Sequence, residues 1–454
     1  MTTAVLFAAS RGPVLERLAE QLAGLGVEEV HVLVAAAPGD DLRALADIAR
    51  GGSGTLLVGA GDVFTHSEAL AGLLRDPRVP SGILASEQAR PGAWGVRSDR
   101  GRVLSVASPY HSVTDPNGAF LGLLKVAPED RAALAEVAAR VAMLGHDGSA
   151  GPADPAALVT VGLVRANVRL SQSFLRELFW ARPRSEPELR DAREAIARID
   201  GDRVVLDSAV KATDGFFTTF FVSPYSKYIA RWAARRGITP NQVTTFSMAL
   251  GLATAAAFAL GSRAGYVAGA VLLQAAFTLD CVDGQLARYT MSFSKFGAWL
   301  DSIFDRAKEY AVYAGLALGA SHAGDPVWLL AGAALTLQTV RHALDFSHAA
   351  SEQHAMAVAP QRPVEEPSDG AVAAAGTARA ARPDRILGSW RRLNRLPGLT
   401  WAKRIVVFPI GERFAAVSIT AALFTPRTTF VVLLAWGAFA ALYGLAGRLL
   451  RSVR

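Results

Sequence analysis

Up to about residue 215, short apolar runs typical of β-strands alternate with stretches that have the spacing of amphipathic helices. The apolar runs are rich in Val, Leu and Ala and lie at 3–9, 28–35 and 54–61. Between them, leucines recur at helical spacing, as in 13–26. This β-α-β-α-β order predicts a parallel sheet with helices on its faces. We therefore expect an α/β domain over residues 1–215, with a hairpin turn at 98–101.

After about residue 240 the pattern changes to long apolar stretches with short polar separations. Each is close to the ~20 residues that a helix needs to cross ~30 Å of hydrocarbon. Six such stretches lie at 242–262, 264–284, 297–320, 326–346, 404–424 and 427–447. The alternative is the buried core of a soluble helical protein, but six such stretches are too many for one soluble domain. We predict an all-α domain of six transmembrane helices over 216–454.

The composition agrees with a membrane protein. Hydrophobic residues make up 51% of the chain and charged residues 19%, below the ~25% charged residues of soluble domains. These values, with a mean hydropathy of +0.26, exclude a disordered or fibrous chain. The single cysteine, Cys281, excludes an intrachain disulfide. The first residues lack a basic stretch and a long apolar core, so we expect no signal peptide.

The distribution of basic residues predicts the orientation. With residues 1–215 in the cytoplasm and six alternating spans, the inner side receives most Lys and Arg residues, including the arginine-rich 379–404. The outer loops then carry only Arg263 and Arg427 as basic residues, as the positive-inside rule requires. Anionic lipid headgroups therefore explain the net charge of +7, and no nucleic-acid-binding motif is evident. We predict a multi-pass protein of the cell membrane with a cytoplasmic N-terminal domain.

Two further segments fit this arrangement. In 225–237, Tyr225, Tyr228 and Trp232 recur at helical spacing among basic residues, which is typical of an interfacial helix on the inner leaflet. An ordinary surface helix is the alternative. Residues 351–383 are rich in Ala, Pro and Gly without periodicity, so we expect a flexible linker between the fourth and fifth spans.

Four aspartates lie where an apolar environment makes them costly. Asp280 and Asp283 are three residues apart, and Asp301 and Asp305 are four apart, so each pair shares one helix face. A carboxylate inside a span costs ~2.5–3.5 kcal/mol on insertion scales, and four together repel one another unless a cation lies between them. Oxygen ligands without His or Cys favour Mg²⁺ or Mn²⁺. A carboxylate-held Mg²⁺ leaves positions for phosphate oxygens, so this pattern indicates metal-assisted phosphoryl transfer at the cytoplasmic side.

These residues resemble the signature of a known family, the CDP-alcohol phosphotransferases (CDP-alcohol phosphatidyltransferases). All eight fixed positions and their spacings agree, namely Asp280, Asp283, Gly284, Ala287, Arg288, Gly297, Asp301 and Asp305. The segment 239–244, Thr-Pro-Asn-Gln-Val-Thr, is similar to the start of that family's catalytic domain. The resemblance extends over about 215–450.

The resemblance implies six membrane helices, commonly a homodimer, and an activity of phospholipid biosynthesis. Such enzymes move a phosphoalcohol, or phosphatidyl, group from a CDP-alcohol to an acceptor alcohol and release CMP. By this resemblance the aspartates hold two Mg²⁺ or Mn²⁺ ions, and Asp305 is also the general base on the acceptor hydroxyl. Gly284 and Ala287 leave room for the CDP group, Arg288 contacts its phosphate, and Gly297 lies beside it. Helix packing is the alternative role for Gly297.

The acceptor site is predicted from basic residues near or within the later spans. Arg341, Lys403, Arg404 and Arg413 are the candidates for holding a phosphate on the acceptor, with His342 nearby. Arg413 is the best placed, although an ion pair with Glu412 or a site aspartate is an alternative role. For the other three, the alternative is charge that fixes the orientation in the membrane.

The first domain has a weaker resemblance, to the sugar-phosphate nucleotidyltransferases that precede some members of the family. Residues 13–34 are similar to the helix-strand unit after the nucleotide loop of that fold, and Asp62 resembles its metal-binding strand end. The loop at 8–13, Ala-Ala-Ser-Arg-Gly-Pro, is short and lacks the lysine of that family. We therefore predict a degenerate domain without cytidylyltransferase activity, in which Asp62 is a turn residue.

Two other classes of function remain as alternatives. An ion-coupled transporter predicts carboxylates dispersed along a pathway, whereas these four lie at one end of two spans. A catalytically inactive membrane anchor that presents the first domain to a partner does not require an intact signature. The sequence does not identify the donor or the acceptor alcohol.

Overall fold

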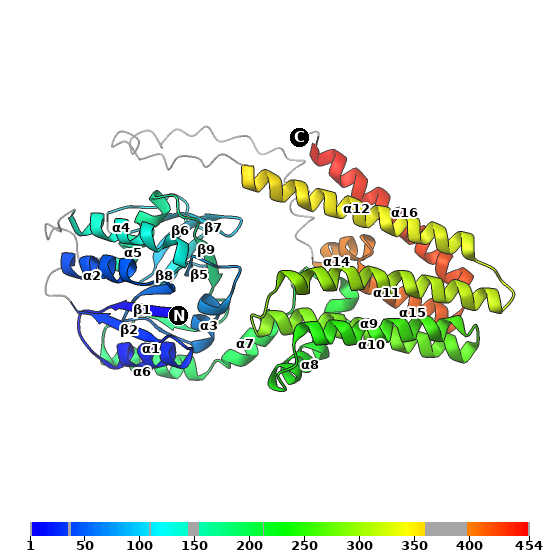
Figure 1. Ribbon diagram of the computed structural model, residues 1–454, viewed down its shortest axis with the longest axis horizontal. Helices are drawn as coiled ribbons and strands as arrows, with labels where there is room; N and C mark the ends of the chain where they lie inside the picture. The colour runs from blue at the N-terminus through cyan, green and yellow to red at the C-terminus, as the bar shows by residue number, and fades with distance from the viewer. Residues whose placement is uncertain are drawn as a thin grey trace. The chain divides into compact units, whose positions relative to one another are not determined.

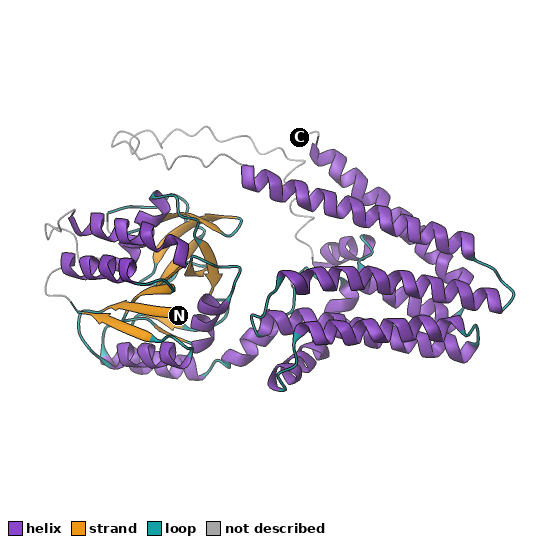
Figure 2. Ribbon diagram, in the orientation of Figure 1, coloured by secondary structure: helices purple, strands orange, loops and turns teal. Residues whose placement is uncertain are grey.

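The chain forms two compact units, Met1–Ser208 and Ala209–Arg454. The computed structural model describes residues 2–34, 38–108, 110–143, 154–211, 213–358 and 397–452. The predicted boundary at 215/216 lies within the second unit. Figure 2 shows the strands in the first unit, and the described residues of the second are helical apart from short connections.

The first unit contains an eight-stranded sheet in the order β2-β1-β3-β8-β5-β9-β7-β6. Figure 1 labels most of these strands. The strands are β1 (Thr2–Phe7), β2 (Glu29–Leu33), β3 (Thr55–Ala60), β5 (Gly82–Ser86), β6 (Trp94–Asp99), β7 (Arg102–Val106), β8 (Gly118–Val126) and β9 (Ser171–Phe174). A separate pair joins β4 (Phe64–Thr65) to β10 (Trp180–Ala181).

The sheet is mixed, not parallel as predicted. Strands β1, β2 and β3 are parallel, which confirms the β-α-β-α-β interpretation of the first 61 residues. Strand β8 runs antiparallel to both of its central neighbours, β3 and β5. All nine residues of β8 are buried, and a continuous buried run carries no sign of strand direction. The predicted turn is confirmed, because β6 and β7 form a hairpin in which Arg100 and Gly101 adopt positive φ.

Helices cover both faces of this sheet and create two apolar cores. Along β1, Val5 and Phe7 face the core that α2, α4 and α5 complete, whereas Ala4 and Leu6 face the core of α1 and α3. The helices are α1 (Pro13–Gly24), α2 (Pro38–Gly51), α3 (Ser67–Arg75), α4 (Arg131–Met143), α5 (Pro155–Arg165), α6 (Glu186–Ala197) and α7 (Gly201–Ser208). The α/β domain is therefore as predicted in its layers.

In the second unit, each of the six predicted apolar stretches overlaps a helix. The unit contains α8 (Ser223–Arg235), α9 (Pro240–Ala259), α10 (Arg263–Tyr289), α11 (Lys295–His322), α12 (Trp328–Val358), α14 (Pro397–Val406), α15 (Ile410–Leu423) and α16 (Pro426–Ser452). Three segments within the described residues are long and apolar enough to cross a membrane, Pro240–Ala259, Arg263–Tyr289 and Pro426–Gly447. The count of six spans remains a prediction.

The predicted fifth span, 404–424, is not one continuous helix. Helix α14 ends at Val406 and α15 begins at Ile410. Pro409 is the residue before α15, and Phe408 has a φ of +55°. A proline lacks the N–H of a helical bond and restricts the residue before it, so the helix is interrupted there. The 14 residues of α15 rise only ~21 Å at 1.5 Å per residue.

The structure describes the predicted interfacial helix at 225–237 and the start of the predicted linker at 351–383. Helix α8 leaves Tyr225, Tyr228 and Trp232 exposed while Ala230 and Ala233 are buried, which is the aromatic face that the interfacial prediction requires. The predicted linker is wrong at its start, because α12 continues to Val358. Residues 359–383 of that linker lie outside the described residues.

Candidate functional site

Helix α9 packs against both α10, which carries Asp280 and Asp283, and α11, which carries Asp301 and Asp305. It begins with a capping box, in which Thr239 and Gln242 each bond the other's backbone N–H. Ser294 caps α11 through the N–H of Gly297 at 2.8 Å. A Cβ at position 297 would lie 2.7 Å from Asn241 Oδ1. The Thr239 motif and Gly297 therefore set how closely the start of α11 approaches the start of α9.

Hydroxyl groups of α9 orient the two aspartates of α10. Thr244 Oγ1 donates to Asp283 Oδ2 at 2.6 Å, and Ser247 Oγ donates to Asp280 Oδ1 at 2.6 Å. Asp283 is only 4% exposed. Because a buried carboxylate needs donors for its oxygens, these two hydroxyls position both side chains. The sequence analysis did not identify Thr244 or Ser247 as site residues.

A lysine that the sequence analysis also missed lies among the carboxylates. Lys308 on α11 is buried, and its Nζ forms an ion pair with Asp280 and lies 3.7 Å from Asp305 Oδ1. Its spacing of three residues from Asp305 places it on the same helix face, which was a readable signal. Lys308 thus supplies one positive charge to a group of four carboxylates.

Asp301 and Asp305 also line a cavity of about 400 Å³. Its other walls come from the first half of α11 and from α12 and α15, through Ala298, Ser302, Arg306, Glu309, His342, Ile410 and Arg413. Asp280 and Asp283 are not part of this described lining. The cavity therefore combines two of the predicted metal ligands with three basic side chains.

The partner of Arg413 is neither Glu412 nor a site aspartate. Arg413 Nε donates to Glu309 Oε1 at 2.9 Å, and both side chains are buried. The hydroxyl of Tyr313 donates to the same oxygen at 2.8 Å, and His342 Nε2 lies 3.4 Å from Glu309 Oε2. Glu309 was missed in the sequence analysis although it is four residues after Asp305 and so shares its helix face.

The other predicted acceptor residues lie away from the described cavity lining. Arg341 donates to the carbonyl of Val407 at 2.7 Å. Arg404 donates to the carbonyl of Asp214 at 3.2 Å and lies over the ring of Trp401. Lys403 is on α14 beside Arg404. Only Arg413 of the four candidates reaches the cavity.

Of the predicted CDP-binding residues, Gly284, Ala287 and Arg288 follow the aspartates along α10. A Cβ at Gly284 would lie 3.2 Å from a guanidinium nitrogen of Arg288, so this side chain already covers the glycine. Arg288 Nε donates to the carbonyl of Ala209. Arg288 thus contacts the first residue of the second unit.

The donor chemistry of the four aspartates fits a hard divalent cation, since all the ligands offered are carboxylate oxygens. Of the four, Asp280 and Asp305 lie within ion-pair distance of Lys308, and Asp283 accepts from Thr244. Among the described residues, no three Asp, Glu, His or Cys side chains are grouped closely enough to hold a metal ion.

In the first unit, Asp62 lies in the turn after β3, as predicted. Its Oδ1 accepts from Arg182 Nε at 2.7 Å, and Asp154 Oδ2 accepts from Arg182 Nη1 at 2.6 Å. Burial alone would lower the pKa of Arg182, but Asp154 and Asp62 outweigh it and raise the pKa above its ordinary value. The guanidinium is therefore a fixed cation between two carboxylates.

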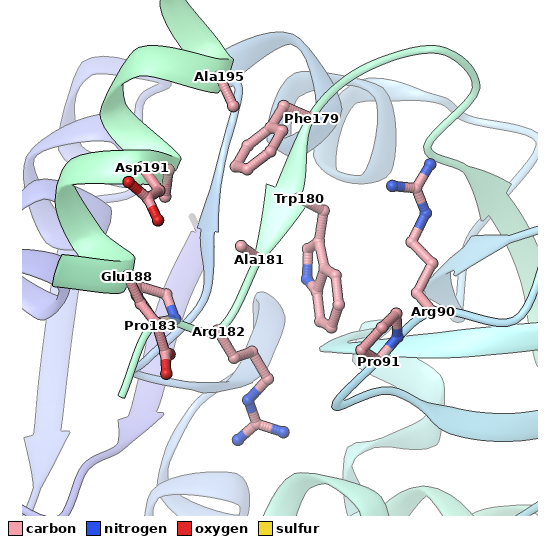
Figure 3. Close-up of a pocket in the computed structure, with 11 residues that line it drawn as sticks. Arg90, Pro91, Phe179, Trp180, Ala181, Arg182, Pro183, Glu188, Asp191 and Ala195 are labelled. Atoms are coloured by element: carbon pink, nitrogen blue, oxygen red, sulfur yellow. The ribbon is translucent and has the colours of Figure 1, made fainter. Parts of the chain in front are cut away.

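Arg182 also lines a cavity of about 440 Å³ (Figure 3). Arg90 and Pro91 lie on the Trp180 side of this cavity, and Glu188 and Asp191 of α6 lie on the other side. Trp180 is held by its indole N–H, which donates to the carbonyl of Leu121 at 3.0 Å.

Part of this chain is similar to known proteins. Residues 237–362 match the family model described as CDP-alcohol phosphatidyltransferase. The archaetidylinositol phosphate synthase of Pyrococcus horikoshii is 42% identical over 91 residues, covering 20% of this chain and 47% of the relative. The bifunctional IPC transferase and DIPP synthase of Aquifex aeolicus is 34% identical over 117 residues, 26% of each chain. The chain thus spans a quarter to a half of the length of these relatives.

Among solved structures, the inositol-1-phosphate CTP transferase from T. maritima is similar to 43% of this chain, covering 95% of its own. The sequence identity is 11% and the TM-score 0.31.

Proposed function

We propose that this protein is a metal-dependent membrane transferase of phospholipid biosynthesis, because residues 237–362 match the CDP-alcohol phosphatidyltransferase family model. It moves a phosphoalcohol or phosphatidyl group from a CDP-alcohol to an acceptor alcohol and releases CMP. The observation that carries the proposal is the placement of Asp280 and Asp283 on α10 and of Asp301 and Asp305 on α11, two helices that both pack against α9. Lys308 pairs with Asp280 and lies 3.7 Å from Asp305, and Asp301 and Asp305 line a cavity. The four aspartates are the acids of the eight-position signature.

We propose that Asp305 is the general base. It lines the cavity in which an acceptor hydroxyl can reach it. Asp305 takes the hydroxyl proton as the acceptor oxygen forms its bond to the donor's phosphorus, and the bond to the CMP oxygen breaks with its electron pair. Divalent ions held by the four aspartates would supply positive charge to the phosphate oxygens.

The remaining signature residues have roles in holding the donor. Gly284 and Ala287 are the small residues of α10 beside which the nucleotide fits. Arg288 is the phosphate contact of this proposal, and it exchanges its bond to the Ala209 carbonyl for one to the donor. A guanidinium binds phosphate better than it binds a carbonyl, because the bond is then charge-assisted.

The cavity favours an acceptor that itself carries a phosphate. Arg306, His342 and Arg413 line it together with Asp301 and Asp305. Anions bind where basic side chains converge in a partly enclosed site. Because one relative is an archaetidylinositol phosphate synthase, we propose an inositol phosphate as the first acceptor to test.

The proposal also covers the arrangement of the protein in the membrane and its assembly. We propose a multi-pass arrangement with the first unit and the site on the cytoplasmic side, and a homodimer. The three described helices of sufficient length and hydropathy support membrane insertion. No observation favours the transporter or the inactive anchor.

Purified protein with Mg²⁺ is expected to release CMP when supplied with a suitable donor and acceptor. The donor panel should include CDP-diacylglycerol and soluble CDP-alcohols, and the acceptor panel inositol phosphate, glycerol phosphate and serine. CMP release that requires both substrates and Mg²⁺ supports the proposal. No release with any pair, from protein that is folded, would contradict it.

For the first unit, we propose that it has no nucleotidyl-transfer activity, because Arg182 forms ion pairs with both Asp62 and Asp154, where a metal ion would be needed. Asp62→Ala is therefore expected to leave CMP release unchanged, within about twofold. The check is the same assay together with CTP consumption in the presence of a sugar or alcohol phosphate. CTP-dependent formation of a CDP-alcohol by the unaltered protein, lost in Asp62→Ala, would overturn this prediction.

A further inference from the structure

Glu412 is a buried carboxylate that the proposed reaction does not use. It lies on the first turn of α15 and is only 6% exposed. Its Oε1 accepts the backbone N–H of Phe217 at 3.2 Å, and the backbone of Phe216 also faces the carboxylate. Because a buried carboxylate is costly unless donors satisfy it, the contact with Phe217 is part of what keeps Glu412 inside the fold.

Residues 215–218, the entry segment, fit closely against the start of α15. A Cβ at Gly215 would overlap the carboxylate of Glu412, and a Cβ at Gly411 would overlap Oγ1 of Thr218. Glycine at both positions therefore allows the two stretches of chain to approach. Contact between the entry segment and α15 is thus made from both sides, by one glycine on each.

Aromatic rings connect the same two parts of the unit. Phe277 of α10 lies between them, with its ring centroid 6.4 Å from that of Phe217 and 5.7 Å from that of Phe414 on α15. Phe277 and Phe414 are both buried. The entry segment, α10 and the start of α15 therefore pack as one group.

The preceding helix does not hold the start of α15 in place, because the chain is interrupted at Pro409. Pro409 is the N-cap residue of α15 and makes no side-chain capping bond. The first N–H groups of a helix have no partner within the helix, so the position of this turn depends on contacts from elsewhere. Glu412 supplies one of them by binding the entry segment.

The same turn of α15 also forms part of the cavity wall. Ile410 and Arg413 line the cavity together with Asp305. Four consecutive residues thus serve two neighbours, since Gly411 and Glu412 contact the entry segment. A shift of this turn would move Ile410 and Arg413 within the cavity.

We propose that Glu412 is a positioning residue of the acceptor site. By binding the entry segment it fixes the first turn of α15, so that Ile410 and Arg413 keep the shape of the cavity. The inference rests on the proposed function, because it assumes that the acceptor binds in this cavity. Glu412 and the entry segment both lie outside residues 237–362, the range that matches the family model.

The test is to measure KM for the acceptor and kcat separately, in full-length protein in detergent with CDP-diacylglycerol as donor and inositol phosphate as the first acceptor. Glu412→Ala removes the acceptor of the Phe217 N–H. It is expected to raise KM about tenfold or more with little change in kcat, because a small misplacement of substrate contacts is costly. Glu412→Gln keeps an oxygen that can accept this bond and is expected to restore the KM of the unaltered protein.

Gly215→Ala perturbs the same contact from the entry segment, because its Cβ displaces the carboxylate of Glu412. It is expected to raise KM in the same direction. In Gly215→Ala/Glu412→Ala the overlap is removed, so KM should be no higher than in Glu412→Ala alone, as for two changes that act through one contact. Gly332→Ala on α12 is the matched control, because a Cβ there meets no described atom within 4 Å.

The outcomes separate this inference from the proposed function. An unaltered KM in folded Glu412→Ala, even with a lower unfolding temperature, would show that Glu412 only stabilises the fold and would overturn the inference while the transferase stays intact. A lower kcat at an unaltered KM would overturn it as well. No CMP release by the unaltered protein with any donor and acceptor would contradict both. If Glu412→Ala does not fold, Gly215→Ala decides, and an unaltered KM in that variant overturns the inference.

Discussion

Replacing Asp305 with asparagine is expected to lower CMP release by about 10³-fold or more while the protein stays folded. General-base catalysis alone contributes about 10²–10⁴-fold, and this carboxylate is also a proposed metal ligand. Asparagine keeps the size of the side chain but cannot accept the proton from the acceptor hydroxyl. Single-turnover measurement of CMP, with saturating donor and acceptor, separates the loss of chemistry from weaker substrate binding.

The matched control is Asp325→Asn in the same unit. Asp325 follows α11 and pairs with Arg427, and the 17 residues from Asp305 to the end of α11 correspond to about 25 Å along the helix. This variant is expected to keep full activity. Size-exclusion elution and thermal unfolding should match the unaltered protein in both variants. Turnover of Asp305→Asn close to that of the unaltered protein would refute the assignment of Asp305 as the base.

The four aspartates could be predicted because their information is local. Spacings of three and four residues fix a shared helix face whatever the tertiary structure is, and carboxylates in an apolar stretch are costly enough to indicate function. The overlap of each predicted apolar stretch with a helix followed from the lengths of these stretches, whereas the count of six spans remains a prediction. The break at Pro409 was also readable, since a proline in a helical pattern restricts the residue before it.

Lys308 and Glu309 show where sequence reasoning stopped. Both lie on the helix face of Asp301 and Asp305, in the middle of the predicted span 297–320 and of α11, where a charged residue is costly and indicates a partner. Their roles depend on partners far along the chain, Asp280 for Lys308 and Arg413 for Glu309. Such pairing is decided by how helices pack, and helix spacing does not encode it.

The antiparallel direction of β8 in the first unit could not be predicted for a comparable reason. The parallel start of the sheet is set by short β-α-β connections, which leave a clear pattern of alternating elements. The order β3-β8-β5 instead joins strands that are distant in sequence, and β8 is buried along its whole length. A uniformly apolar strand fits either direction, so its antiparallel pairing followed only from the folded sheet.

Removing the charge of Arg413 is expected to destabilise the helical unit by about 3–5 kcal/mol, because one member of a buried ion pair is left without its partner. In Arg413→Met, Glu309 keeps Tyr313 and His342 as neighbours but loses its guanidinium. The midpoint of unfolding in a denaturing detergent measures the change. Arg427→Met, which breaks the exposed pair with Asp325, is the matched control and should change stability little.

The double variant Glu309→Leu/Arg413→Met separates structure from substrate binding. Replacing both members of a buried pair with apolar residues is often neutral or stabilising. We therefore expect the double variant to regain most of the stability that Arg413→Met loses. The interaction energy between the two sites should then be ~0.5–3 kcal/mol or more. If Arg413 also binds the acceptor's phosphate, this stable protein will still have a KM for the phosphorylated acceptor raised at least about tenfold, the factor that ~1.4 kcal/mol of lost binding produces. Recovery of both stability and an unaltered KM would show that Arg413 serves only to hold Glu309, and would assign the acceptor's phosphate to Arg306 and His342, the other basic residues of the cavity lining.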